Sequence, residues 1–168
     1  MKKYVLSILV DNHANVMARV ASLFARRRFN MSSVTAATTC DPTVSVISIV
    51  TEGDEHNLEQ IIKQTRKLQE VKEVTVLPPD ESLLYEMLIL KLAFGEANIS
   101  SLRDIVEVYR AKIIDLTSSS MVVELTGKPS KIDGFLEVMS PYNILEMCRS
   151  GIIGMSRGNQ SDWWKSGR

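Results

Sequence analysis

The side chains best suited to bind a small molecule gather at the start of one predicted helix and just after its end. Asn12 and Asn15 lie in the turn that leads into this helix, and Asn30 follows it. Backbone N–H groups left free at a helix start attract an anion such as a carboxylate, and asparagine side chains both donate and accept hydrogen bonds. The segment therefore predicts a corner that suits a small amino acid. Residue type alone favours helix caps for Asn12 and Asn15 and a turn residue for Asn30.

The sequence offers no catalytic set and no metal site. His13 and His56 are the only histidines, and no cysteine or carboxylate cluster accompanies them at ligand spacing. The G-x-S-x-G, G-x-G-x-x-G and G-x-x-x-x-G-K-[ST] patterns are missing. We therefore expect neither catalytic residues nor a bound metal on this chain.

Composition narrows the class of partner. The 168 residues are 45% apolar, and 20 basic residues balance 20 acidic ones, so no overall field attracts nucleic acid or an anionic membrane. No apolar run approaches the roughly 20 residues that span a bilayer. Cys40 and Cys148 are far apart and too few for a closed zinc site. We expect a soluble protein of a reducing cytoplasm in which both thiols are packed.

The first half of the chain alternates strand and helix patterns. Residues 4–10 form an apolar strand, 31–39 and 43–51 form a β-hairpin, and 71–77 form a fourth strand. Two helices fall between them, each with apolar residues at i, i+3, i+4 or i+7 spacing. The predicted buried face of the first helix consists of Val16, Val20, Leu23 and Phe24.

The second half repeats this order after a break at Pro78 and Pro79. Strand patterns cover 83–94, 112–119, 120–127 and 143–150, with helices between them. Both halves thus have βαββαβ order, which predicts an α+β fold of two ferredoxin-like domains, residues 1–78 and 79–158, and a polar tail, 159–168. Each sheet would carry two helices on one face, and its open face or edge predicts a homodimer. Trp163 and Trp164 in the tail suit either a flexible end or an anchor for a partner.

Several separated segments resemble one family. LVDNHANVMARVASLFARRRFN (9–30), YRAKIIDLTSSSMVVELTGKPSKIDGFLEVM (109–139) and RSGIIGMSRG (149–158) resemble the regulatory, or small, subunit of acetohydroxyacid synthase, also called acetolactate synthase. These segments occur in the order and at the spacing of that family. The resemblance extends from the first strand to about Gly158 and identifies residues 1–78 as an ACT domain.

The resemblance implies a non-catalytic regulatory subunit of branched-chain amino acid biosynthesis. Such a subunit binds and activates the catalytic subunit, which would carry thiamine diphosphate, magnesium and FAD. It commonly confers feedback inhibition by valine or another branched-chain amino acid, bound where two ACT domains meet in a homodimer. Carried over to this sequence, the effector-binding residues are Asn12, Asn15, Val16 and Met17 of one subunit and Asn30 and Met31 of its neighbour.

Two positions depart from the family pattern. Asn15 and Arg28 stand where the family usually has glycine, in a G-V-L run and in R-G-Y-N or R-G-F-N. Glycine lets backbone and ligand approach closely, whereas Asn15 adds a side chain where a carboxylate would bind. Losing one hydrogen bond to a charged group would lower affinity by about 10- to 100-fold. We therefore hypothesise that valine binds weakly or not at all. Arg28, near a helix C-terminus, predicts a different exit from the helix.

Other functions share this fold. A stand-alone ACT-type sensor that regulates another enzyme or a transcription factor fits the same residues. RNA-recognition modules share the βαββαβ order, but the central strands 5–10 and 44–50 lack the aromatic residues on which bases stack. An acylphosphatase-like hydrolase needs an arginine-bearing phosphate loop after the first strand, and residues 10–16 contain no arginine.

Overall fold

The structure is a computed structural model that describes residues 2–96 and 98–158, arranged as two compact units. Unit 1 comprises residues 2–84 and 152–158, and unit 2 comprises residues 85–151. The sequence places the boundary at residue 78 instead, and assigns 79–158 wholly to the second domain. The units divide later because Leu84 and Ile152 both pack on the apolar cluster of unit 1. The tail, residues 159–168, lies outside the described residues, and so do its two tryptophans.

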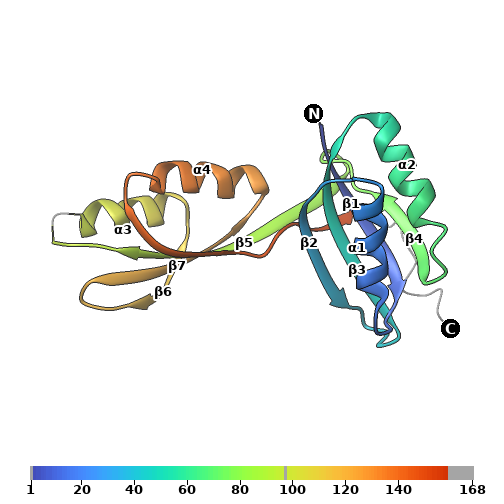
Figure 1. Cartoon of the computed structure of the whole chain (residues 1–168). Coiled ribbons are helices and arrows are strands. Elements are labelled where there is room, and N and C mark those ends of the chain that lie inside the picture. Colours follow the sequence, from blue (N-terminus) through green and yellow to red (C-terminus); the bar gives the residue numbers. More distant parts are fainter. Residues whose placement is uncertain (1, 97, 159–168) are drawn as a thin grey trace. The chain divides into compact units, whose positions relative to one another are not determined.

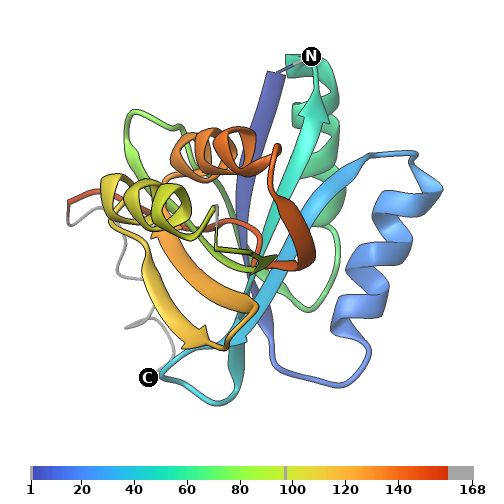
Figure 2. The same ribbon diagram turned by 90° about the vertical axis from the view of Figure 1, so that its left-hand side faces the viewer.

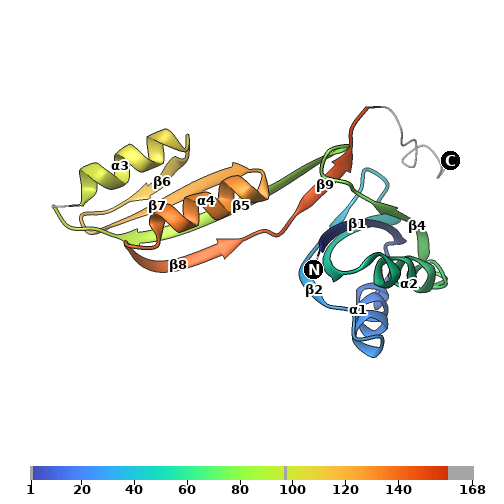
Figure 3. The ribbon, with the colours of Figure 1, turned by 90° about the horizontal axis from the view of Figure 1, so that it is seen from above.

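Unit 1 is a four-stranded antiparallel sheet in the order β2-β3-β1-β4. Helices α1 and α2 lie on one side of this sheet (Figure 3). Its elements are β1 (Lys2–Asp11), α1 (Val16–Arg26), β2 (Met31–Thr38), β3 (Val44–Gly53), α2 (Glu55–Thr65) and β4 (Val71–Val76).

Unit 2 repeats that topology, with a sheet in the order β6-β7-β5-β8. Figures 1 and 2 show the yellow α3 and orange α4 side by side on one face of this sheet. Its elements are α3 (Ile99–Val108), β6 (Lys112–Leu116), β7 (Ser120–Gly127), α4 (Pro129–Met139), β8 (Asn143–Arg149) and β5 (Ser82–Ala93), whose first three residues belong to unit 1. The prediction of an α+β fold with two ferredoxin-like units is confirmed.

The core of unit 1 follows the predicted periodicities. The four buried residues of α1 are the four that the sequence predicts, Val16, Val20, Leu23 and Phe24. Alternate residues of β1, Leu6, Ile8 and Val10, pack against this helix face. Full burial contributes about 1.5–3 kcal/mol per large apolar side chain, so this helix face is a main source of stability.

A short strand that the sequence does not predict, β9 (Ile153–Ser156), brings the chain back to unit 1. It pairs with β5, and Arg157 donates its backbone N–H to the carbonyl oxygen of Glu81. Next to it, Ile152 packs with Val5, Val50 and Leu77 on the sheet face opposite the helices. This face, expected to lie open, is therefore partly covered by the chain itself.

The expectation that both thiols are packed is wrong, because Cys40 and Cys148 are free and exposed. Cys40 lies in the β2–β3 turn and Cys148 on β8, every residue of which is exposed. Among the described residues, no helix has both the length and the apolar character needed to cross a membrane.

Candidate functional site

The predicted polar corner is held in place by the turn between β2 and β3. Asn12 donates from Nδ2 to the carbonyl oxygen of Pro42 at 2.8 Å. Its backbone N–H donates to the carbonyl oxygen of Thr43 at 2.7 Å. The Nδ2 group of Asn12 therefore has a structural partner already, and its exposed amide joins the corner and the turn into one local unit.

The turn itself is organised by Asp41. Its Oδ1 atom accepts hydrogen bonds from the hydroxyl of Thr43 at 2.6 Å and from the backbone N–H of Thr43 at 2.9 Å. These two bonds, the hydroxyl first, stabilise the ionised carboxylate and hold the pKa of Asp41 below its usual value. The turn is thus a preformed support for Asn12.

The other acidic group of the corner is neutralised. Asp11 ends β1, and its Oδ1 atom lies 2.7 Å from Nζ of Lys72 on β4. This ion pair offsets the negative charge next to the start of α1. A carboxylate that approaches the helix start therefore meets less repulsion than the sequence of the corner suggests.

Asn15 is the N-cap residue of α1, as its type predicts, but its side chain makes no capping hydrogen bond. Its φ angle is 74°, in the left-handed region, whereas a capping side chain normally requires an extended backbone. The first helical bond runs from the N–H of Arg19 to the carbonyl of Asn15. Met17 and Ala18 accordingly have no carbonyl four residues earlier within the helix, so their N–H groups are the natural anion donors.

Val16 and Met17 play different parts. Val16 is 5% exposed and packs in the core, so only its backbone is available to a ligand. The Met17 side chain is 39% exposed beside the corner. Met17 can therefore contribute an apolar contact to a ligand, and Val16 cannot.

Asn30 and Met31 lie beyond the other end of α1. Asn30 is exposed, and its carbonyl oxygen accepts a 2.6 Å hydrogen bond from the hydroxyl of Thr51. Met31 begins β2 and is half-buried against the core. The chain reaches them through Arg28, whose φ angle is 57°. The predicted change of helix exit is wrong, because Arg28 adopts the left-handed conformation that glycine would adopt.

The two groups of predicted residues do not meet within one chain. Asn12, Asn15 and Met17 lie at the start of α1, and Asn30 and Met31 lie past its end. A helix of 11 residues is about 16 Å long at about 1.5 Å per residue. A small amino acid cannot span that length, so the two groups do not form a single small-molecule site within one chain.

No cluster of three or more histidine, cysteine, aspartate or glutamate side chains suited to a metal lies within residues 2–96 and 98–158. What the corner offers is hydrogen bonding and charge rather than a reactive group. The sequence does not predict the role of Pro42 and Thr43, whose carbonyl oxygens hold Asn12. Their role depends on a contact across 30 residues, which no local pattern reveals.

Comparison with known proteins matches both units to domains of the same protein, the small subunit of acetolactate synthase, which is abbreviated AHAS. Residues 6–73 match the family described as AHAS small subunit-like ACT domain, and residues 85–158 match the family described as small subunit of acetolactate synthase. The chain is 37% identical to the acetolactate synthase small subunit of Buchnera aphidicola, over 92% of this chain and 98% of that protein. It is 38% identical to the isozyme 3 small subunit of Escherichia coli, over 93% and 96% respectively.

A solved structure agrees with this match. The crystal structure of the acetolactate synthase small subunit from Thermotoga maritima aligns with a TM-score of 0.88 and 37% identity. The alignment covers 95% of this chain and 99% of that one. Both units and their connection along the chain are thus represented in a single solved relative.

Proposed function

The chain belongs to the family of acetolactate synthase small subunits, and from this premise we propose that it binds the catalytic subunit, raises its activity and senses a branched-chain amino acid. It is a regulatory subunit of branched-chain amino acid biosynthesis and is not itself an enzyme. The observation that carries this conclusion is the match of nearly the whole chain to nearly the whole of its relatives. Thiamine diphosphate, magnesium and FAD belong, in this proposal, to the catalytic subunit, with which the chain works in the cytoplasm.

A homodimer through the ACT domains accounts for the divided set of effector residues. Strand β2 is an edge of the sheet and has eight residues, Met31 to Thr38. Antiparallel pairing of two copies of β2 about a two-fold axis brings Met31 of one copy to Thr38 of the other. Thr38 leads directly into the turn to which Asn12 is bonded. This pairing would place Asn30 and Met31 of one copy beside the corner of its neighbour.

An effector carboxylate suits the start of α1 in such a dimer. The N–H groups of the first helical turn and the positive end of the helix dipole favour an anion there. The exposed Met17 side chain offers an apolar contact for an aliphatic side chain. The Asn15 side chain, which the family's glycine would lack, stands in the path of a carboxylate that approaches the start of α1. Weak binding of valine is therefore the expected behaviour of this chain.

The function is tested by adding the purified chain to a candidate acetolactate synthase catalytic subunit. Activation of the synthase is the expected result. Valine, leucine and isoleucine are then added separately to the reconstituted enzyme. If the chain raises no activity and does not co-purify with the catalytic subunit, the alternative of a stand-alone ACT-type sensor takes its place.

The effector corner is tested separately by calorimetry with valine. Asn15→Gly keeps the left-handed backbone and removes the side chain, so we expect valine to bind about 10- to 100-fold more tightly than to the unmodified chain. Arg28→Gly is the matched control, because it restores the other family glycine and leaves the start of α1 unchanged. Tight binding of valine to the unmodified chain would overturn the weak-binding hypothesis without affecting the partnership with the catalytic subunit.

A further inference from the structure

The sheet face of unit 1 opposite its helices is covered at one end only. Pairing of β1 with β3 and β4 arranges the side chains of this face in three rows: Val46, Leu9 and Glu73; Ser48, Ser7 and Thr75; Val50, Val5 and Leu77. The third row is buried beneath Ile152 and Leu84. The first two rows lie next to β9 and are not part of the cluster that contains Ile152 and Leu84.

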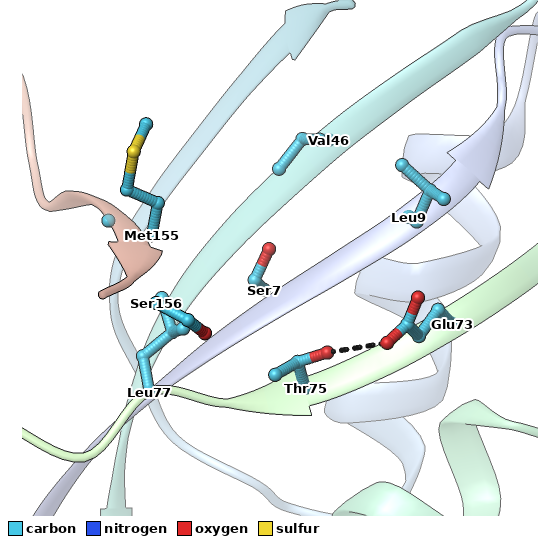
Figure 4. Close-up of a pocket in the computed structure, with 9 residues that line it drawn as sticks. Ser7, Leu9, Val46, Glu73, Thr75, Leu77, Met155 and Ser156 are labelled. Carbon is cyan, nitrogen blue, oxygen red and sulfur yellow. Dashed lines mark hydrogen bonds between the residues drawn. The ribbon is translucent and has the colours of Figure 1, made fainter. Parts of the chain in front are cut away.

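A pocket of about 200 Å³ lies at this place, within unit 1. Figure 4 shows Met155 and Ser156 of β9 on one side and Val46, Leu9 and Glu73 of the sheet on the other. Enclosed cavities of about 150 Å³ accept a benzene ring, so this volume suits a somewhat larger ring. The pocket lies on the face opposite α1, which separates it from the effector corner.

The lining of the pocket selects an apolar group accompanied by a cation. Leu9, Val46, Leu77 and Met155 provide apolar walls, and methionine sulfur packs well on aromatic rings. Glu73 is the only charged residue of the lining, and its Oε1 atom accepts a 3.1 Å hydrogen bond from the hydroxyl of Thr75. An acidic ligand is disfavoured here, because a carboxylate would face Glu73 with no compensating cation in the lining.

The chain itself carries a group of this chemistry a few positions after the pocket lining in the sequence. Beyond Ser156, which lines the pocket, the sequence continues to Trp163, Trp164 and Lys165. Trp163 is seven positions after Ser156. An extended chain covers about 3.3–3.6 Å per residue, so this stretch reaches roughly 24 Å. The segment is long enough to turn back over the lining that Ser156 belongs to. Its aromatic pair and following cation complement the apolar walls and Glu73.

We propose that the C-terminal segment 159–168 docks on this face, with an indole of the Trp163–Trp164 pair in the pocket and Lys165 close to Glu73. The segment thereby completes the cover that β9 begins. A tryptophan side chain buries a large apolar area, whereas the exposed ion pair contributes mainly orientation. The family match ends at residue 158. The proposed cover would therefore be formed by residues that lie outside the matched domain.

Intrinsic fluorescence of the full chain tests the proposal directly, because Trp163 and Trp164 are its only tryptophans. We expect emission at shorter wavelength than that of free tryptophan and slow quenching by acrylamide. Val46→Phe fills the pocket from a half-buried strand position and should shift the emission to longer wavelength and speed quenching. Val122→Phe is the matched control, since Val122 is a half-buried valine on β7, the strand of unit 2 equivalent to β3.

A charge reversal makes the test independent of pocket filling. Glu73→Lys should expose the tryptophans, and adding Lys165→Glu should restore the protected emission. Unperturbed emission in Val46→Phe, or no restoration in the double variant, would overturn the proposal. Protection that is lost when the protein is diluted would place the segment on a second copy and would equally overturn docking within one chain.

Discussion

Phe29 donates its backbone N–H to the carbonyl oxygen of Phe24 at 2.9 Å, and the two rings meet edge to face with centroids 5.9 Å apart. Arg28, which precedes Phe29 in the sequence, donates its backbone N–H to the carbonyl oxygen of Ala25 at 3.1 Å. This pair of bonds is the Schellman ending of a helix, which places a left-handed residue at the position of Arg28. The turn between α1 and Asn30 therefore has the backbone conformation that glycine usually adopts, although its left-handed residue is Arg28.

Replacing Arg28 with glycine should stabilise the protein. The left-handed conformation costs a non-glycine residue about 1–2 kcal/mol, and the greater freedom of glycine in the unfolded chain offsets about 0.4–1 kcal/mol. We expect a net gain of about 1 kcal/mol in the free energy of unfolding, measured by denaturant titration. Arg110→Gly should stabilise the protein similarly, because Arg110 follows α3 with a φ angle of 54° and the same pattern of backbone hydrogen bonds.

The matched control for this prediction is Arg27→Gly. Arg27 precedes the turn with a φ angle of −91°, so glycine relieves no strain there and should destabilise the chain slightly. Equal changes in the free energy of unfolding for Arg27→Gly and Arg28→Gly would show that relief of the left-handed backbone is not the cause of the stabilisation.

Removing Arg149 should destabilise unit 2. Glu86 is only 4% exposed, and Arg149 donates to its Oε2 atom from Nε at 2.6 Å. Burial acts to lower the pKa of Arg149, but the hydrogen bonds to Glu86 and Asp133 outweigh it and raise the pKa. Arg149→Met would leave the Glu86 carboxylate buried without its cation, at a cost of about 3 kcal/mol in the free energy of unfolding.

Hydrogen exchange of β5 and β8 amides would localise the loss caused by Arg149→Met. Asp133→Asn is its control, since the Asp133 side chain is 62% exposed and the change should cost no more than about 1 kcal/mol. Restoration of stability by adding Glu86→Gln would support the assigned cause, whereas a larger loss in the double variant would contradict it.

Gly154 should not tolerate alanine. A Cβ atom there would lie 2.6 Å from Cδ2 of Leu84 and 2.9 Å from Cδ1 of Leu77, both packed under the returning chain. We expect Gly154→Ala to destabilise the packing of β9 by about 1–3 kcal/mol, measured as faster hydrogen exchange in β9 and at Leu77. Gly95→Ala, where no atom lies within 4 Å, should stay within about 0.5 kcal/mol of the parent chain.

The Asp41 turn should be most stable above the ordinary carboxylate range. Because the folded pKa of Asp41 is lowered, its contribution is fully present above the unfolded pKa of about 3.9 and is lost as pH falls through the lower folded pKa. Thr43→Val removes the hydroxyl donor and keeps the backbone N–H donor. An NMR titration should then find the pKa of Asp41 higher than in the parent chain, and an unchanged pKa would assign the shift to the backbone bond alone.

Much of the fold follows from local pattern. The 3.6-residue spacing of Val16, Val20, Leu23 and Phe24 identified the buried face of α1. Asp54 caps α2, and its side chain accepts a 2.8 Å hydrogen bond from the backbone N–H of Asn57. Such features could be predicted because each depends on residues only a few positions apart.

The sequence by itself therefore determined the two βαββαβ repeats, the polar corner and the family. Only the tertiary structure decided that residues 152–158 return to unit 1, that Asn12 is held by Pro42, and that Asn15 and Arg28 keep left-handed backbones. Four residues of β9 are too few to show a period, and Asn12 and Pro42 are 30 positions apart. These features depend on packing between segments that are far apart in the sequence. Local residue preferences do not report on such packing.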